Sequence, residues 1–343
     1  WFKLCCTLFI IYNSIKMESI FAISLAQNAS DLHLSSGQRP TIRVNGQLNY
    51  LEHAVLQPDI LEQQLYQLLS ELQLQQLKID RQIDFAYHHE QYGRFRGNIF
   101  YQQNGISAAF RLIKQTIPTL NKLGAPTIFT ELIEKQQGLI LITGATGSGK
   151  STTLAALIQH INQSKAKHII TLEDPIEFIY PAGKALIQQR EVNLHIYEFE
   201  SALKSLLRQD PDIILLGELR NQQTIQAALT AAETGHLVLA TLHTNSAIQS
   251  INRIVDVFPG EMKHFVKAQL ADCLCAVINQ TLVMNTQNTG RFAAYEVLIN
   301  TPAVSHLIKE GKNSQIFSLL QTGQQYGMQT MEQGIRQGLQ QNQ

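Results

Sequence analysis

Residues 144–151 of this 343-residue chain follow the pattern Gly-x-x-x-x-Gly-Lys-Ser, which is suited to holding phosphate groups. The glycines let successive backbone N–H groups turn inward around phosphate oxygens, and the start of a following helix adds the positive end of its dipole. Lys150 would reach the β- and γ-phosphates of a nucleotide, and the Ser151 hydroxyl would bind Mg²⁺. The residues expected to contact the nucleotide are Gly144, Ala145, Thr146, Gly147, Ser148, Gly149, Lys150, Ser151 and Thr152.

The segments on both sides of this phosphate loop support the interpretation. Residues 139–142 are an apolar run typical of a buried strand. Residues 152–161 predict a helix with Leu154, Leu157 and Ile158 on one face. A strand, a glycine-rich loop and a helix in this order are the context that a phosphate-binding loop requires. The loop alone does not indicate which class of P-loop enzyme this is.

Acidic and imidazole side chains follow three later predicted strands. Glu173 and Asp174 follow the first, Glu218 follows the second after a glycine, and His243 ends the third. Ligands of open parallel sheets bind outside the carboxyl ends of the strands, so these groups are expected to converge on the γ-phosphate and its metal ion. The three strands are predicted at residues 168–172, 212–216 and 236–243.

The chemistry of phosphoryl transfer suggests a role for each group. A water must be aligned with the γ-phosphorus, and Glu218 is the best candidate for the base that orients or deprotonates it; a helix N-terminal charge is the alternative. Glu173 and Asp174 are suited to position water-bound Mg²⁺ or to share in activating the water, although Asp174 also fits a plain turn before a proline. His236 and His243 flank one strand and are suited to donate hydrogen bonds to phosphate, unless they are satisfied core residues.

Three arginines are further candidates. Alternation along residues 94–96 places Arg94 and Arg96 on one face of a predicted strand, with Arg111 on the neighbouring strand. Arginines stabilise the negative charge that develops in phosphoryl transfer. We therefore expect these guanidinium groups to be able to reach a nucleotide held by the next domain or subunit. A solvated arginine face is the alternative interpretation.

Composition narrows the classes of protein. A length of 343 residues with 44% hydrophobic residues suggests two domains, each with a core. The 27 basic and 27 acidic residues balance, so no overall field favours nucleic acid or lipid as a partner, although net charge does not report a local basic channel. The cysteines occur as Cys5-Cys6 and Cys273-x-Cys275, without zinc-site spacing, which is typical of a reducing cytoplasm.

The first sixteen residues differ from the rest of the chain. Residue 1 is a tryptophan, and the apolar residues 8–11 are too few to span a bilayer. Met17, in contrast, begins a plausible helix. We interpret residues 1–16 as an upstream read-through that is not part of the fold; a short membrane-touching anchor is the alternative.

Beyond Met17 the chain divides into two predicted domains. Residues 17–113 are rich in short strands and predict a small α+β domain. Residues 114–128 contain prolines and a glycine and predict a linker. Residues 129–343 alternate strands and helices, which predicts an α/β nucleotide-binding core with a mostly parallel sheet. The strands of the first domain are predicted at residues 31–34, 41–44, 94–101 and 107–113, and its main helix carries apolar residues from Ile60 to Leu72.

Four sequence boxes resemble the PilT family of secretion-superfamily ATPases, the motors that depolymerise type IV pili for twitching motility. The resemblance extends over nearly everything from Met17 onward and implies a PAS-like N-terminal domain before a RecA-like P-loop core. It also implies a homo-hexameric ring with ATP between the two domains, within reach of arginines such as Arg94, Arg96 and Arg111. The boxes are residues 29–34, 171–178, 207–220 and 230–244.

The resemblance implies a motor that powers pilus retraction from the cytoplasmic side of the inner membrane, at the pilus base. Its expected partners are an inner-membrane platform protein and a paralogous motor, with no direct contact to nucleic acid and no transmembrane span. The absence of a tetracysteine zinc module from the sequence favours retraction over assembly.

Several positions depart from the family pattern, and of residues 305–309, which lie where retraction ATPases have an Ala-Gly-Leu-Ile-Arg motif, only Leu307 and Ile308 match. Lys309 replaces an arginine and loses its bidentate fork, Asn221 replaces an aspartate, and Ala145 is a mild change within the loop. Two other functions remain open: an assembly, secretion or DNA-uptake ATPase of the same superfamily, and a non-hydrolysing ring component that binds nucleotide to regulate a partner motor.

Overall fold

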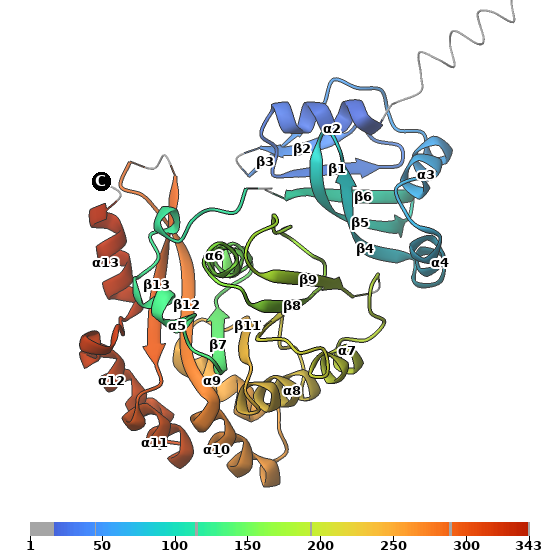
Figure 1. The fold of residues 1–343 in the computed structure, drawn as a ribbon. Helices are drawn as coiled ribbons and strands as arrows, with labels where there is room; N and C mark the ends of the chain where they lie inside the picture. Colours follow the sequence, from blue (N-terminus) through green and yellow to red (C-terminus); the bar gives the residue numbers. More distant parts are fainter. Residues whose placement is uncertain (1–16, 45, 114–115, 193, 288–289, 342–343) are drawn as a thin grey trace, which may run out of the picture. The chain divides into compact units, whose positions relative to one another are not determined.

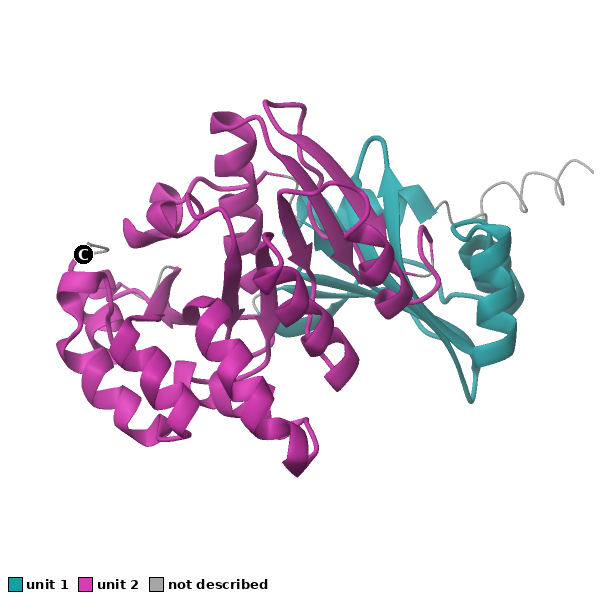
Figure 2. Cartoon of the chain, turned by 60° about the horizontal axis from the view of Figure 1, so that its bottom comes forward, with its two compact units in different colours: residues 1–115 teal, residues 116–343 magenta. Residues whose placement is uncertain are grey.

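The computed structural model describes residues 17–341 except residues 45, 114–115, 193 and 288–289 (Figure 1). The interpretation of residues 1–16 as a read-through lies outside the described residues. The chain divides into two compact units, residues 1–115 and 116–343 (Figure 2). The boundary between the units falls within the segment that the sequence predicts as a linker.

A six-stranded sheet forms the centre of the first unit in its described part (Figure 1). The strand order is β3-β2-β1-β6-β5-β4, and every neighbouring pair is antiparallel. The elements are α2 (Met17–Ala26), β1 (Asp31–Ser35), β2 (Thr41–Val44), β3 (Gln47–Tyr50), α3 (Pro58–Tyr66), α4 (Glu71–Asp80), β4 (Gln82–His89), β5 (Gly93–Gln102) and β6 (Gly105–Ile113).

The single helix predicted between Ile60 and Leu72 is two helices, α3 and α4. The side chain of Ser70 accepts a hydrogen bond from the backbone N–H of Gln73, and the Gln73 side chain accepts one from the backbone N–H of Ser70. This reciprocal capping box begins a new helix inside a run whose apolar spacing suggests continuity.

One face of this sheet carries the core of the first unit. The ring of Phe21 on α2 packs against Phe95, with ring centroids 4.6 Å apart, and against Phe110, with centroids 5.1 Å apart. Because side chains alternate along β5, burial of Phe95 leaves Arg94 and Arg96 partly exposed on the opposite face.

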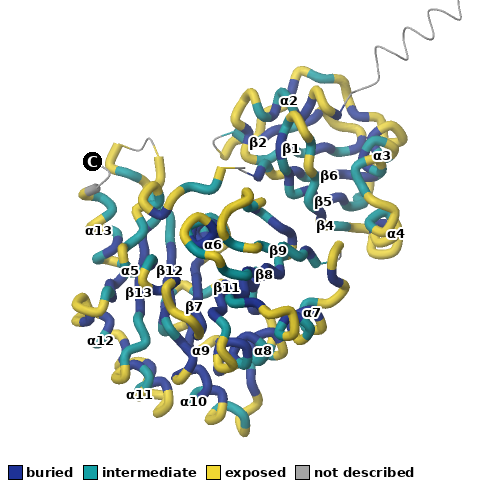
Figure 3. Tube along the Cα trace, viewed as in Figure 1, coloured by how far each residue is buried: buried dark blue, intermediate teal, exposed yellow. Residues whose placement is uncertain are grey.

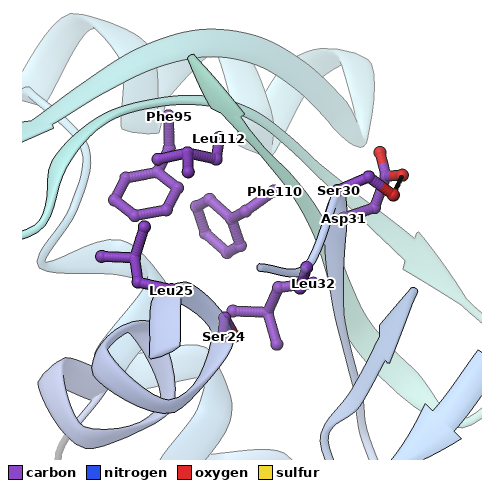
Figure 4. Close-up of a pocket in the computed structure, with 9 residues that line it drawn as sticks. Ser24, Leu25, Ser30, Asp31, Leu32, Phe95, Phe110 and Leu112 are labelled. Carbon is purple, nitrogen blue, oxygen red and sulfur yellow. Dashed lines mark hydrogen bonds between the residues drawn. The ribbon is translucent and has the colours of Figure 1, made fainter. Parts of the chain in front are cut away.

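A small hollow remains beside these rings. Its volume is about 10 Å³, and it is lined by Leu25, Phe95 and Phe110 among others (Figure 4). A space of this size holds about one water molecule, so this hollow does not accommodate a small-molecule ligand.

A seven-stranded sheet forms the centre of the second unit in its described part. The strand order is β13-β12-β7-β11-β10-β8-β9, and neighbouring strands are parallel except for β12 and β13. The strands are β7 (Gly138–Thr143), β8 (His168–Glu173), β9 (Leu186–Glu191), β10 (Ile213–Leu216), β11 (Leu237–Leu242), β12 (Leu274–Met284) and β13 (Arg291–Ile299). The helices are α5 (Ile128–Leu132), α6 (Lys150–Ser164), α7 (Phe199–Leu206), α8 (Gln222–Glu233), α9 (Ala247–Asp256), α10 (Lys263–Cys273), α11 (Pro302–Glu310), α12 (Ile316–Thr322) and α13 (Met331–Gln341), with 3₁₀ turns at Asn121–Leu123, Gly260–Met262, Asn313–Gln315 and Gln324–Tyr326.

Helices cover both faces of this sheet. Leu139 and Leu141 of β7 belong to the core under α7 to α12, whereas Ile140 and Ile142 belong to the core under α5 and α6. Strands β7 and β11 are therefore buried along their whole length (Figure 3). The predicted α/β core with a mostly parallel sheet is confirmed. No helix among the described residues combines the length and the apolar character that crossing a membrane requires.

Candidate active site

The phosphate loop joins a buried strand to the start of a helix. Strand β7 ends at Thr143, and α6 begins at Lys150. Gly144, Gly147 and Gly149 have φ values of 141°, 78° and 91°, which side-chain-bearing residues rarely adopt. A Cβ atom on Gly144 would also lie 2.3 Å from the carbonyl oxygen of Gln280. Backbone conformation therefore requires all three glycines, and close packing against Gln280 adds a second requirement at Gly144 and Gly149.

Lys150 lies buried against this loop. Its Nζ donates hydrogen bonds to the carbonyl oxygens of Gly144, at 2.8 Å, and Ala145, at 3.0 Å. Burial lowers the pKa of the Lys150 ammonium, and the nearby carboxylates of Glu218 and Glu177 oppose that shift. The positive charge is thus fixed at the loop that is expected to hold phosphate.

A chain of charged and polar groups connects Lys150 to the ends of neighbouring strands. The Nδ1 atom of His243 lies 3.5 Å from Lys150 Nζ, and its Nε2 atom lies 3.4 Å from one carboxylate oxygen of Glu218. Arg220 Nε lies 2.9 Å from the other oxygen of Glu218, and Arg220 also pairs with Asp174 at 3.1 Å. The structure thus brings Asp174, Glu218 and His243 together beside the phosphate loop.

Backbone contacts fix the segment that carries Glu218. The N–H of Gly217 donates to the carbonyl of Leu172 at 2.8 Å, and the N–H of Leu219 donates to the carbonyl of Thr241 at 3.0 Å. The Thr241 hydroxyl donates to the carbonyl of Gly217. A Cβ atom on Gly217 would lie 3.3 Å from the Leu172 carbonyl oxygen. The small residue before Glu218 therefore lets the end of β10 lie close to the end of β8.

Glu173 lies at the end of β8 in a different environment. Its carboxylate accepts hydrogen bonds from Thr171 Oγ1 at 2.7 Å and from Gln189 Nε2 at 3.2 Å. Burial raises the pKa of the Glu173 carboxyl, and these two hydrogen bonds only partly oppose that effect. Glu173 is therefore a carboxyl for which ionisation is costly in the folded protein.

Glu173→Gln is expected to increase the free energy of unfolding at neutral pH. Because the folded-state pKa lies above the ordinary value of 4.5, the stability that Glu173 contributes is fully present below that value and is lost as pH rises through the raised pKa. Glutamine does not ionise, and its oxygen can still accept both hydrogen bonds. Urea denaturation from about pH 4 to about pH 8 should show the variant's advantage growing with pH.

The exposed Glu332, on α13, provides a matched control, because its side chain is 82% exposed. Glu332→Gln should show no comparable growth of stability with pH. An advantage of Glu173→Gln that is constant across the pH range would contradict the expected cause.

His236 lies away from the cluster formed by Lys150, His243 and Glu218. It precedes β11, and its carbonyl accepts a hydrogen bond from the N–H of Gly138 at the start of β7. Its Nδ1 atom lies 3.1 Å from the carbonyl oxygen of Ala231. Because β7 and β11 are parallel, their N-terminal ends lie together, at the end of the strands opposite to the phosphate loop. The structure therefore does not bring His236 to the phosphate loop of its own unit.

Gln280 on β12 is a site residue that the sequence analysis missed. Its Nε2 donates to the carbonyl oxygen of Ser148 at 2.8 Å, and its Oε1 accepts from Thr153 Oγ1 at 2.7 Å. The residue is only 3% exposed. Gln280 thus supports the phosphate loop and the first turn of α6 together. The available signal was a pair of amide residues, Asn279 and Gln280, inside a long apolar run.

The three candidate arginines lie in the first unit. Strand register places Arg96 directly opposite Arg111, and Arg94 follows the same alternation along β5, so the predicted shared face is confirmed. Arg111 pairs with Asp31 at 2.8 Å, and its side chain is 66% exposed. Contact between these arginines and a nucleotide stays a prediction.

Comparisons with known proteins agree with this geometry. The family model described as type II/IV secretion system protein matches residues 13–343. The uncharacterised protein YggR of Escherichia coli K12 is 50% identical over 93% of this chain and 97% of its own length. The type IV pilus retraction ATPase PilT of Pseudomonas aeruginosa is 45% identical over 93% of both chains. A crystal structure of the pilus retraction motor PilT with bound ADP is similar with a TM-score of 0.88 and 42% identity, over 96% of this chain and 94% of that one.

Proposed function

The chain belongs to the type II/IV secretion system protein family, and from this premise we propose that it is an ATP-hydrolysing motor that powers type IV pilus retraction. The observation that carries the proposal is the cluster of Lys150, His243 and Glu218 at the carboxyl ends of parallel strands. Similarity to the ADP-bound PilT motor along almost the whole chain supports nucleotide as the ligand of this cluster.

Each residue of the cluster has a defined part in hydrolysis. Lys150 and the loop amides bind the β- and γ-phosphates, since the ammonium is already fixed at the loop. Glu218 accepts a proton from the attacking water as that water's oxygen bonds to the γ-phosphorus and the bond to ADP breaks. His243 lies between Glu218 and Lys150 in the structure, and in our proposal it donates a hydrogen bond to the transferred phosphoryl group once nucleotide is bound.

We propose that Mg²⁺ is held at this site through few protein contacts. The described residues contain no group of three or more His, Cys, Asp or Glu side chains that could hold a metal ion by themselves. Magnesium sites of nucleotide enzymes use one or two protein oxygens together with waters and substrate phosphates. In our proposal the Ser151 hydroxyl, in the first turn of α6, binds the ion, and Glu173 and Asp174 contact it through water. The ion would neutralise charge on the phosphates.

The proposal extends to the assembly. We place Arg94, Arg96 and Arg111 of one subunit at the nucleotide of a neighbouring subunit in a homo-hexameric ring. The exposed guanidinium of Arg111 and the shared face of the three residues support such a contact. We further place the ring on the cytoplasmic side of the inner membrane, with a platform protein and a paralogous motor as partners.

A comparison of two strains tests the function. In cells that carry type IV pili, deletion of the gene and Glu218→Gln should both give hyperpiliated cells that do not twitch, because pili would form without being withdrawn. Glu233→Gln, which changes a carboxylate on α8 outside the cluster, should leave twitching normal. Bald cells in the deletion strain would instead indicate an assembly motor. Normal twitching in the Glu218→Gln strain would contradict hydrolysis as the source of work.

A further inference from the structure

A row of buried polar residues crosses three strands beside the phosphate loop. Thr143 at the end of β7 lies opposite Asn279 of β12, and Asn279 lies opposite Glu296 of β13. Their exposed fractions are 0%, 2% and 7%. Asn279 Nδ2 donates to Thr143 Oγ1 at 2.9 Å and to the carbonyl of Thr244 at 2.8 Å. The row therefore contacts both the strand end before the phosphate loop and the residue after His243.

Glu296 ends this row and has no part in the phosphoryl chemistry described above. Its Oε1 accepts a hydrogen bond from the backbone N–H of Ala247, the first residue of α9, at 2.7 Å. The same carboxylate lies near the backbone N–H of Met331, the first residue of α13. Burial raises the pKa of Glu296, and these two backbone N–H groups oppose that shift. One carboxylate thus lies at the starts of two helices.

Helix α13 is closely packed on the strand that carries Glu296. A Cβ atom on Gly334 would lie 2.3 Å from the carbonyl oxygen of Tyr295, and one on Gly338 would lie 2.1 Å from the ring of Phe292. Two glycines one turn apart therefore let the helix backbone approach β13 directly. The start of α13 and the strand that carries Glu296 are therefore in direct contact.

The hydrogen bond between Glu296 and the backbone N–H of Ala247 is made close to the active site. Ala247 is four residues after His243, and the short segment between them is also held through Asn279 and by the hydroxyl contact of Thr244 with Ser250, at 2.6 Å. We propose that Glu296 is a positioning residue for His243 and couples the start of α13 to the loop that carries this histidine. The inference rests on the proposed function insofar as His243 takes part in hydrolysis.

A double-mutant cycle in the full-length chain tests the proposal. Glu296→Ala should lower kcat about tenfold, with KM and the Kd for ADP within about twofold of the wild type. Glu296→Gln, whose oxygen can still accept from Ala247, should keep at least about a third of the wild-type kcat. In a His243→Ala background, Glu296→Ala should have no further effect, because both changes remove the same contribution. If kcat of the double variant falls by the product of the two single-variant effects, the proposal is overturned.

A second measurement separates positioning from general destabilisation. Val304→Ala on α11 removes buried volume far along the chain from the loop and serves as the matched control, since Val304 is fully buried. It should lower Tm without changing kcat. Hydrogen exchange of residues 243–247 should become faster in Glu296→Ala and not in Val304→Ala. Unchanged exchange in Glu296→Ala would overturn the coupling, whereas a wild-type chain without ATPase activity would refute the proposed function alone.

Discussion

Glu218→Gln is expected to reduce ATP turnover by about 10²- to 10⁴-fold, the usual contribution of a positioned acid–base group. Glutamine has the same shape, and its oxygen can still accept the hydrogen bond from Arg220. It cannot take a proton from water. Because Lys150 and the loop amides are untouched, the Kd for nucleotide should stay within about threefold of the wild type.

Single-turnover hydrolysis and binding of a fluorescent ADP analogue measure the two quantities separately. Glu233→Gln is the control, because Glu233 accepts a hydrogen bond from Gln269 and lies outside the cluster. If Glu218→Gln hydrolyses ATP at the wild-type rate, Glu218 is not the base.

Lys150→Met is expected to weaken ATP binding by at least about 100-fold, because charge-assisted hydrogen bonds to phosphate contribute about 1.5–3 kcal/mol each. Folding should be affected much less. The variant loses two hydrogen bonds to loop carbonyls, but it no longer buries an ammonium group, and the two effects offset each other. We expect the free energy of unfolding to change by about 1 kcal/mol or less.

Lys165 offers a matched control at the other end of α6. Its Nζ also donates to a backbone carbonyl, that of Ile133, at 3.1 Å, and it pairs with Glu134 at 2.8 Å. Lys165→Met should bind ATP normally in calorimetric titration. Equal loss of binding in both variants would indicate damage to α6 rather than loss of a phosphate contact.

Much of this site was predictable because its signals are local in sequence. The phosphate loop lies between a short apolar strand and an amphipathic helix, and each of Glu173, Glu218 and His243 ends a predicted strand or follows one within two residues. Parallel strands bring such ends to one edge of a sheet. Spacing along the chain and the direction of the strands were therefore enough to place Glu218 and His243 near Lys150.

Gln280 was not predictable in the same way. Strand β12 begins at Leu274 directly after α10 ends at Cys273, so no turn residues separate the two elements. The contact of Gln280 with the phosphate loop depends on the pairing of β12 with β7, which no local pattern encodes. Arg220 was visible within a sequence box, but its simultaneous contact with Glu218 and Asp174 depends on the approach of β10 to β8.

The two histidines show a different limit of prediction from the sequence. Both flank the same strand, and residue type alone made them equivalent candidates. Strand direction distinguishes them, because His236 precedes β11 and His243 follows it. Similarly, the apolar spacing from Ile60 to Leu72 suggested one helix, whereas the side chain of Ser70 caps a second one. Strand direction decides which histidine lies near the phosphate loop, and a polar capping residue decides where the second helix begins. Hydrophobic periodicity reports neither feature.

The dependence of the phosphate loop on β12 has a consequence for synthesis on the ribosome. Ser148 and its partner Gln280 are 132 residues apart in sequence. A nascent chain that ends after β11 contains every residue of the nucleotide-binding motif but lacks the strand that supports it. We therefore expect such a chain to leave the loop unformed, so that the growing polypeptide acquires affinity for nucleotide only when most of the second unit has been translated.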